Sequence, residues 1–310
     1  MTVVAAGVVV LVAIGLPHLL TLERTPPGFA AAIWLSVLML RALVSLAAAV
    51  AAEVYLPVTG WVAPLESWCV RGASPLSGHD AADIVLAVPA LVLALSLCWV
   101  MLDLWRASRR VQALLRTATV GPGPGGSVIV ADGAMLVAAA GLRRPQVVIS
   151  AGALVQLDDD ELLASLDHER GHIAMRHRYL LVAGELARAV ARLLPGTQAA
   201  ARELLFSLER DADRNALDRR HDPKVLASAI YKAARGATAA PALALGGGVV
   251  VRRARLLLEA STRPAHLGLI ALAPVMVALV AASAIALPFA AHAGYHRAHD
   301  HGQACDTYKT

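Results

Sequence analysis

Four long blocks of apolar residues dominate the pattern along the chain, and polar segments separate them. The blocks are Met1–Leu22, Gly28–Val54, Asp83–Trp105 and His266–Ala291. Each block is long enough to cross a bilayer as a helix, which takes about 20 residues. The first block has no Lys or Arg before Arg24, so it lacks the positive region that begins a cleaved signal peptide. We therefore expect four retained transmembrane helices.

The segment between the third and fourth apolar blocks has the pattern of a small mixed domain. After the glycine-rich break at Gly121–Gly126, the runs SVIV, AMLVAAA and QVVIS predict a small sheet. ELLASLDHERGHIAMRH has an apolar face at helical spacing, and Asp158 followed by Glu161 has the spacing of a capping box. Further helices are expected over YLLVAGELARAVARLLPG, ARELLFSLERDADRNAL and Pro223–Gly236, whereas the low-complexity run Pro241–Val251 predicts a flexible link.

Composition and charge fit a membrane protein and set its orientation. Charged residues make up 16% of the chain and mean hydropathy is +0.60, whereas soluble domains carry about 25% charged residues. Between Arg106 and Arg263 lie 23 of the 28 Lys and Arg residues, while the loop between the second and third blocks has only Arg71. Basic loops stay in the cytoplasm. This bias also accounts for the net charge of +5, so we expect no direct binding of nucleic acid.

These patterns predict a mainly α integral membrane protein with a cytoplasmic, zincin-like α+β catalytic domain inserted between spans three and four. The predicted parts are a three-helix transmembrane region at 1–105 with an extracellular loop at 55–82, the catalytic domain at 106–264, the fourth span at 265–291 and a short tail at 292–310. The N-terminus and the tail are expected outside the cell membrane, and the catalytic domain faces the cytoplasm.

His168-Glu169-Arg170-Gly171-His172 forms an H-E-x-x-H pattern inside one predicted helix. The two histidines are one turn apart on the same face, so both rings can reach one metal ion. Glu169 lies near enough to polarise a water molecule on that metal. A chance pattern on a solvated helix is the simpler alternative, and the capping box and apolar face of this helix argue against it.

A second predicted helix, ARELLFSLERDADRNAL, supplies the groups that such a site still lacks. A catalytic zinc takes three protein ligands and keeps one position open. Glu209 is a suitable third ligand, and Asp213, one turn later, could accept the other ring N–H of a ligand histidine. We therefore predict one Zn²⁺ per chain, bound by His168, His172 and Glu209, with Glu169 as the general base.

Side chains outside this motif leave more than one interpretation open. Cys69 and Cys305 both fall in predicted extracellular segments, where a disulfide can persist, but the sequence gives no distance between them. The histidine-rich tail near Cys305 could bind a transition metal, although a solvated tail is the simpler interpretation. Arg41 lies inside the second block, where an ionisable group indicates either a function or a side chain that faces the bundle.

Taken together, these segments resemble the BlaR/MecR-type membrane metallopeptidases, and more closely their short actinobacterial form. The resemblance covers nearly the whole chain, and its specific parts are HERGH and the E-x-x-x-D of Glu209–Asp213. It implies a gluzincin in which His168, His172 and Glu209 bind zinc and Asp213 supports a ligand. The sensors of that family respond to β-lactams and inactivate a repressor, but here a short tail stands where they carry a penicillin-binding domain.

The function expected from these features is hydrolysis of peptide bonds in a cytoplasmic or membrane protein, in signal transduction that relieves a BlaI/MecI-like repressor. The protein substrate would then be a small winged-helix repressor. An HtpX-like quality-control protease is the alternative within enzymes, and a non-catalytic, metal-binding scaffold is the alternative outside them. His177 and Arg214 are the candidates for stabilising the oxyanion, because they lie near the motifs in the sequence.

Overall fold

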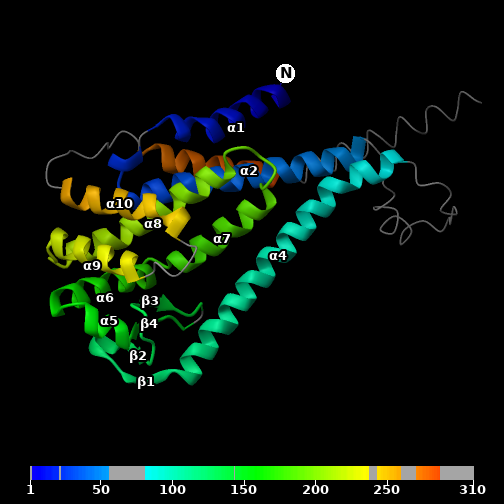
Figure 1. The fold of residues 1–310 in the computed structure, drawn as a ribbon. Coiled ribbons are helices and arrows are strands. Elements are labelled where there is room, and N and C mark those ends of the chain that lie inside the picture. The colour runs from blue at the N-terminus through cyan, green and yellow to red at the C-terminus, as the bar shows by residue number, and fades with distance from the viewer. Residues whose placement is uncertain are drawn as a thin grey trace, which may run out of the picture.

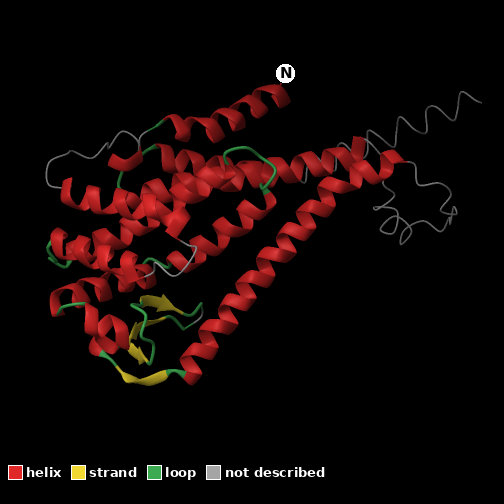
Figure 2. Cartoon of the chain, in the orientation of Figure 1, coloured by secondary structure: helices red, strands yellow, loops and turns green. Residues whose placement is uncertain are grey.

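The computed structural model describes residues 2–20, 22–55, 81–142, 144–236, 243–259 and 270–286 of the chain. Within these ranges the chain is mostly helical, with one small sheet (Figures 1 and 2). The elements are α1 (Thr2–Leu19), α2 (Pro27–Tyr55), α4 (Ala81–Thr117), β1 (Thr119–Pro122), β2 (Val128–Val130), β3 (Val137–Ala140), β4 (Gln146–Ser150), α5 (Ala151–Gln156), α6 (Asp159–Ala174), α7 (His177–Val190), α8 (Thr197–Asp218), α9 (Pro223–Gly236), α10 (Leu243–Glu259) and a last helix, Leu272–Ala286.

Two described helices are long and apolar enough to cross a membrane: Pro27–Ala49 within α2 and Leu91–Thr117 within α4. Two shorter apolar helices, Gly7–Leu19 and Leu272–Ala286, correspond to the first and fourth blocks of the sequence. Length and composition support a membrane protein only weakly, because the buried helix of a soluble core has the same composition. A topology with four spans therefore stays a prediction.

Helix α2 is the central helix of the bundle. Ile33, Val37 and Leu38 on it are fully buried, in one apolar cluster that α1, α7, α8 and the last helix also enter. Figure 1 shows α1, α2 and the last helix side by side, with α8 and α7 below them. The sequence predicted α2 only as an apolar segment. In the structure α7 and α8 pack against it.

Arg41 lies in the middle of α2 and faces the bundle, as one of its two interpretations expected. The side chain is buried. Its guanidinium donates to the carbonyl of Pro195 in the turn between α7 and α8, and lies 3.1 Å from the His18 Nε2 atom. A buried guanidinium must be hydrogen-bonded to be tolerated. Arg41 therefore ties the α7–α8 turn to the centre of α2.

The predicted sheet is present, with one strand more than expected. Its order is β1-β2-β4-β3, in which β2 and β4 are parallel and both outer pairs are antiparallel. The sequence missed β1, because Gly121 and Pro122 indicated a turn rather than a strand. Strand β3 is an outer strand of the sheet and contacts α6. Backbone groups on its unpaired side are therefore directed towards the helix with the H-E-x-x-H motif.

The flexible link expected over Pro241–Val251 is a wrong prediction, since helix α10 begins at Leu243. Glycine weakens an isolated helix by about 1 kcal/mol per residue, but packing can override that cost. Leu257 of α10 is buried in a cluster with Leu226 of α9 and Ala164 of α6. Residues 56–80, 260–269 and 287–310 lie outside the described part, and with them the predicted outer loop, the histidine-rich tail, Cys69 and Cys305.

Candidate metal centre

Helix α6 carries the H-E-x-x-H motif and begins with the predicted capping box, which the structure confirms. The Glu161 backbone N–H donates to the Asp158 carboxylate over 2.8 Å, and the Asp158 N–H donates to Glu161 over 3.0 Å. Further along, Gly171 lets α6 approach α8 closely. A Cβ atom at Gly171 would lie 3.2 Å from the Cα atom of Ala212. The glycine of HERGH therefore brings the two predicted ligand helices together.

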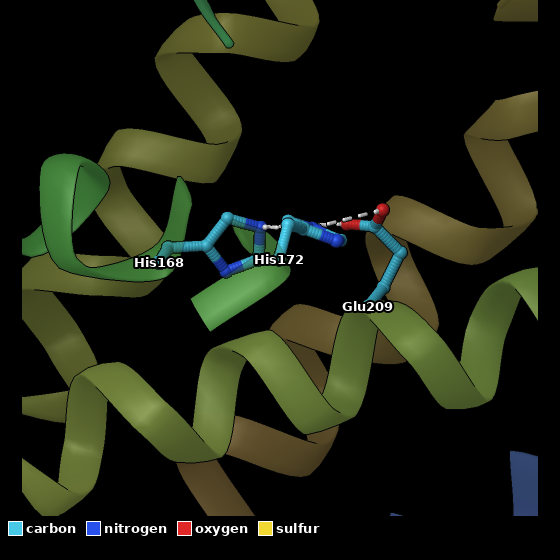
Figure 3. A group of neighbouring side chains, drawn as sticks. All are labelled: His168, His172 and Glu209. Atoms are coloured by element: carbon cyan, nitrogen blue, oxygen red, sulfur yellow. Dashed lines mark hydrogen bonds and ion pairs between the residues drawn. The ribbon is translucent and has the colours of Figure 1, made fainter. Parts of the chain in front are cut away.

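The structure brings His168, His172 and Glu209 to one point, as the sequence predicted (Figure 3). The Nε2 atoms of the two histidines are 3.2 Å apart. Glu209 places Oε2 3.6 Å from the Nε2 of His168 and Oε1 3.6 Å from the Nε2 of His172. One donor atom from each residue thus lies within 4.8 Å of the others.

This donor set fits a zinc ion. Zinc takes imidazole nitrogen and carboxylate oxygen at about 2.0–2.2 Å in tetrahedral geometry, which separates neighbouring ligand atoms by about 3.3–3.6 Å. The two Nε2 atoms are 3.2 Å apart, and each lies 3.6 Å from a different carboxylate oxygen of Glu209, so these separations are close to that range. Three protein ligands would leave a fourth position open, which distinguishes a catalytic zinc site from a structural one.

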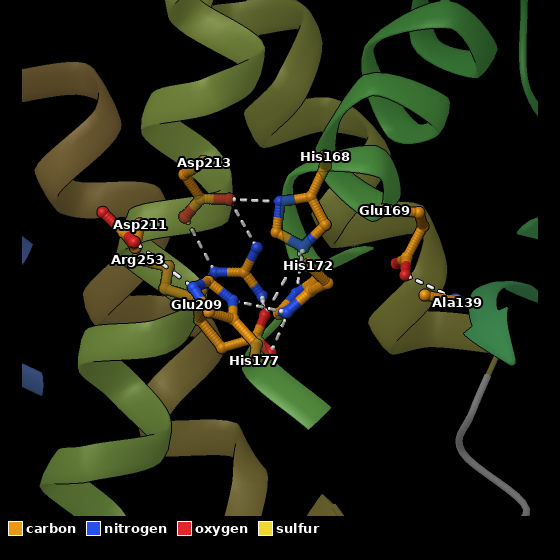
Figure 4. A network of polar contacts seen from close by, with 9 residues as sticks. All are labelled: Ala139, His168, Glu169, His172, His177, Glu209, Asp211, Asp213 and Arg253. Atoms are coloured by element: carbon orange, nitrogen blue, oxygen red, sulfur yellow. Dashed lines mark hydrogen bonds and ion pairs between the residues drawn. The ribbon is translucent and has the colours of Figure 1, made fainter. Parts of the chain in front are cut away.

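Asp213 and Arg253 surround the candidate ligands with paired charges (Figure 4). The Nδ1 atom of His168 lies 3.0 Å from Asp213 Oδ1, so this carboxylate can hold the ring with Nε2 turned to the metal. Arg253 of α10 donates to both Asp213 oxygens, over 2.6 and 2.9 Å, and to Glu209 Oε2 over 2.5 Å. Asp213, which is buried, and Glu209, which is half-buried, therefore share one cationic partner.

The two histidines differ in their electrostatic surroundings. Burial lowers the pKa of His168, but hydrogen bonds to Asp213 and Glu209 outweigh burial and raise it to about 9. Burial also lowers the pKa of His172; the charge of Glu209 raises it, but His168, His177 and Arg253 oppose a proton as well, and the pKa falls to about 4. The Nδ1 atom of His168 thus faces a carboxylate, that of Asp213, whereas the Nδ1 atom of His172 faces the ring of His177.

Glu169 lies apart from the three ligands and faces the edge strand. Its Oε2 atom accepts a hydrogen bond of 2.7 Å from the backbone N–H of Ala139 in β3. Burial raises the pKa of Glu169 above its usual value. Glu169, His168 and Glu209 line a common cavity of about 200 Å³, together with residues of β3, α9 and α10. A buried carboxylate with a raised pKa beside a cavity is suited to accept and donate protons.

Arg253 is the main residue of the site that the sequence did not indicate. In the sequence it is one of the 23 basic residues between Arg106 and Arg263, it follows the predicted link, and no motif connects it with Glu209 or Asp213. The helical spacing of Arg253 and Leu257 in VVVRRARLLLE is the one signal that could have revealed α10.

The two oxyanion candidates lie elsewhere. His177 is buried behind His172, with its Nδ1 atom 2.9 Å from the Nδ1 atom of His172. Arg214 is exposed and lines two other cavities, beside the turn before α2. Neither residue lines the cavity that contains Glu169. Both residues are near the motifs in the sequence, but their side chains lie outside the cavity that contains Glu169.

The arrangement has the groups that a metallopeptidase site needs: two histidines and a carboxylate around one point, with a second carboxylate in the adjoining cavity. The family model of peptidase family M48 matches residues 107–240. That stretch contains the sheet, α6 and α8, so the match supports an M48 family metallopeptidase, and such peptidases are typically zinc-dependent. No curated protein and no solved structure matched the chain.

Proposed function

We propose that this protein is a membrane-bound, zinc-dependent endopeptidase. The observation that carries the proposal is the set of separations among the donor atoms of His168, His172 and Glu209, which suit a tetrahedral zinc ion. Glu169 adds the group that a structural zinc site does not need. Its place in the cavity that His168 and Glu209 also line speaks against a non-catalytic, metal-binding scaffold.

Zinc in this site would supply a Lewis acid for the hydrolysis of a peptide bond. Glu169 would accept a proton from the attacking water and later deliver it to the leaving amine. Asp213 would hold the His168 ring, since its Oδ1 atom lies 3.0 Å from the His168 Nδ1 atom, and Arg253 would hold the Glu209 carboxylate through a hydrogen bond. The protein thus provides a positioned base and a preorganised ligand set.

Strand β3 is the proposed binding edge for the substrate backbone. It is an outer strand of the sheet, and its Ala139 N–H already donates into the cavity. An extended peptide can add to such an edge through main-chain hydrogen bonds. On the opposite side of the cavity α9 contributes small residues, among them Ala229, Ala233 and Ala234, which leave room for substrate side chains.

We infer that the chain crosses the cell membrane four times, with the metal centre on the cytoplasmic side. The turn between α1 and α2 supports the relative placement, because Arg210 of α8 donates to its carbonyls at Glu23 and Thr25, and Arg252 of α10 pairs with the Glu23 carboxylate. The turn and the metal-binding helices therefore lie on one side. The bias of basic residues makes that side the cytoplasm, with the N-terminus and the tail outside.

The proposed biological role is signal transduction in which a cytoplasmic, BlaI/MecI-like repressor is inactivated by cleavage. The resemblance of the chain to the BlaR/MecR-type peptidases supports this role. The match to family M48 supports the peptidase chemistry, and an HtpX-like role in membrane protein quality control would use the same site. The two roles differ in the substrate, which is one defined repressor in the first case and many damaged membrane proteins in the second.

The test compares cells that express the wild type with cells that express Glu169→Gln, by quantitative proteomics of protein termini. The variant is expected to retain zinc and to lose cleavage, because the amide keeps the size of the side chain but cannot accept the proton. Asp160→Asn is the matched control, since Asp160 is an exposed carboxylate on the same helix. Equal cleavage by wild type and Glu169→Gln would rule out the proposed peptidase.

A further inference from the structure

His177 is a fully buried histidine that the proposed chemistry does not use. It is the first residue of α7 and follows Arg176, whose backbone is left-handed with φ of 58° and ψ of 32°. A non-glycine residue rarely adopts this conformation. The turn after α6 thus accepts a costly backbone geometry, and in doing so it folds the His177 ring back against His172 (Figure 4).

The contacts of His177 form a chain that runs from the metal centre to a carboxylate. Its Nδ1 atom is 2.9 Å from the Nδ1 of His172, and its Nε2 atom is 3.2 Å from Oδ2 of Asp211. When His172 uses Nε2 for a metal, its proton must lie on Nδ1, which then donates to His177 Nδ1. His177 consequently carries its proton on Nε2 and donates it to Asp211. One set of tautomers satisfies both contacts.

Asp211 ends this chain at the first turn of α2. A Cβ atom at Gly28 would lie 3.7 and 3.8 Å from the two carboxylate oxygens of Asp211. The first N–H groups of a helix have no partner within the helix and favour a nearby negative charge. The carboxylate that holds His177 is therefore placed between α8 and the start of the apolar helix α2.

We propose that His177 is a positioning residue for the second metal ligand, and that Asp211 holds it in the required tautomer. This inference rests on the proposed zinc site. The two ligand histidines are then held by separate carboxylates of α8: His168 directly by Asp213, and His172 through His177 by Asp211. The second of these connections ends beside the first turn of α2.

The test measures zinc binding by the full-length protein in detergent, by competition with a chromophoric chelator, and the visible spectrum of the Co²⁺-loaded protein. His177→Phe keeps a ring of similar size without hydrogen bonds and is expected to weaken zinc binding by about 10- to 100-fold. It should also shift the Co²⁺ bands. His177→Gln, whose amide can both accept and donate, should recover most of the affinity. Asp211→Ala should also weaken zinc binding, although it leaves the His177 ring in place.

Asp218→Asn is the matched control, because Asp218 is an exposed carboxylate on the same helix, and its zinc affinity should equal that of the wild type. The inference is overturned if His177→Phe and Asp211→Ala bind zinc as tightly as the wild type with unchanged Co²⁺ bands. If the wild type itself binds no zinc, the proposed function fails as well. Wild-type binding together with unaffected variants overturns the positioning role alone.

Discussion

The region around the candidate metal centre and the apolar helix α4 differ in how much of their side-chain surface is covered by protein. Around α6, α8 and α10, buried charged groups such as Asp213, Glu209 and Arg253 are paired with one another. On α4, by contrast, Leu95 and Trp99 are each 60% exposed, although they are large and apolar. The charges of the first region are paired among the described residues, whereas α4 has apolar surface that a lipid environment would cover.

This difference predicts how strongly a single substitution affects each region. Around the candidate metal centre, distances and partners define what each residue does, so single substitutions should have large and specific effects. In the apolar helices the effect of a substitution should depend on whether the side chain meets protein or lipid. The contrast can be tested at four places, from the strongest expected effect to the weakest.

His168→Ala should have the largest effect, because it removes one of three proposed ligands. Binding of a zinc ion by a protein site is worth about 10–16 kcal/mol in total, so the loss of one ligand should weaken binding by about 100-fold or more. Metal content after dialysis, measured by mass spectrometry, checks this. His221→Ala is the control, because His221 contacts Asp167 and not the metal site. Full zinc content in His168→Ala would place the metal elsewhere.

Arg253→Met should destabilise the fold most strongly among charge substitutions. Removing it leaves Asp213 and Glu209 buried beside each other without their cation, and breaking a buried ion pair from one side costs about 3–5 kcal/mol. Denaturant unfolding of the purified protein in detergent measures the change. Arg255→Met is the control. Arg255 is exposed and pairs with Glu259 at the surface, so its loss should leave the free energy of unfolding unchanged. Equal stability of both variants would show that the network around Arg253 is not structural.

Leu38→Ala and Leu95→Ala compare the two long apolar helices directly. Leu38 of α2 is completely buried, so its truncation leaves a cavity and should cost about 2–5 kcal/mol. Leu95 of α4 has few protein contacts to lose, and its truncation in detergent should cost less than about 1 kcal/mol. Thermal unfolding of both variants provides the comparison. Similar losses for the two would indicate that α4 packs against protein in the native state.

The pair of Glu161 and Lys232 should show the smallest effect. Burial opposes ionisation of Glu161, but hydrogen bonds from Lys232, Ser228 and the Asp158 N–H hold its pKa below the usual value. Lys232 is partly exposed, so a double-mutant cycle with Glu161→Gln and Lys232→Met should give a coupling of about 1 kcal/mol. Urea unfolding provides the four free energies.

The pH dependence of this coupling follows from the direction of the shift. Because the folded pKa of Glu161 is depressed, its stabilisation is complete above the unfolded pKa of about 4.3 and is lost as the pH falls through the folded pKa. The cycle repeated at neutral and acidic pH checks this sign. A coupling that grows towards acidic pH would contradict the assignment of Glu161 as the ionised partner.

The local features of the site could be predicted from the sequence, and its long-range contacts could not. The capping box at Asp158, the H-E-x-x-H helix and the second helix with Glu209 all follow from short patterns, and the structure brings the candidate ligands together as expected. Arg253 lies 44 residues beyond Glu209 in the sequence, after a glycine-rich run. The contact of Arg253 with Glu209 depends on the packing of α10 on α8 and α9. The sequence could not indicate it, because the glycine-rich run before Arg253 has low helix propensity.

The position of Asp211 between Glu209 and Asp213 has a consequence for the length of α8. Each residue advances a helix by about 100°, so the three carboxylates have different partners: the proposed metal for Glu209, His177 for Asp211 and His168 for Asp213. Insertion or deletion of one residue between Gly196 and Glu209 would turn all three away together. Sequence variation in this part of α8 should therefore consist of substitutions and not of changes in length.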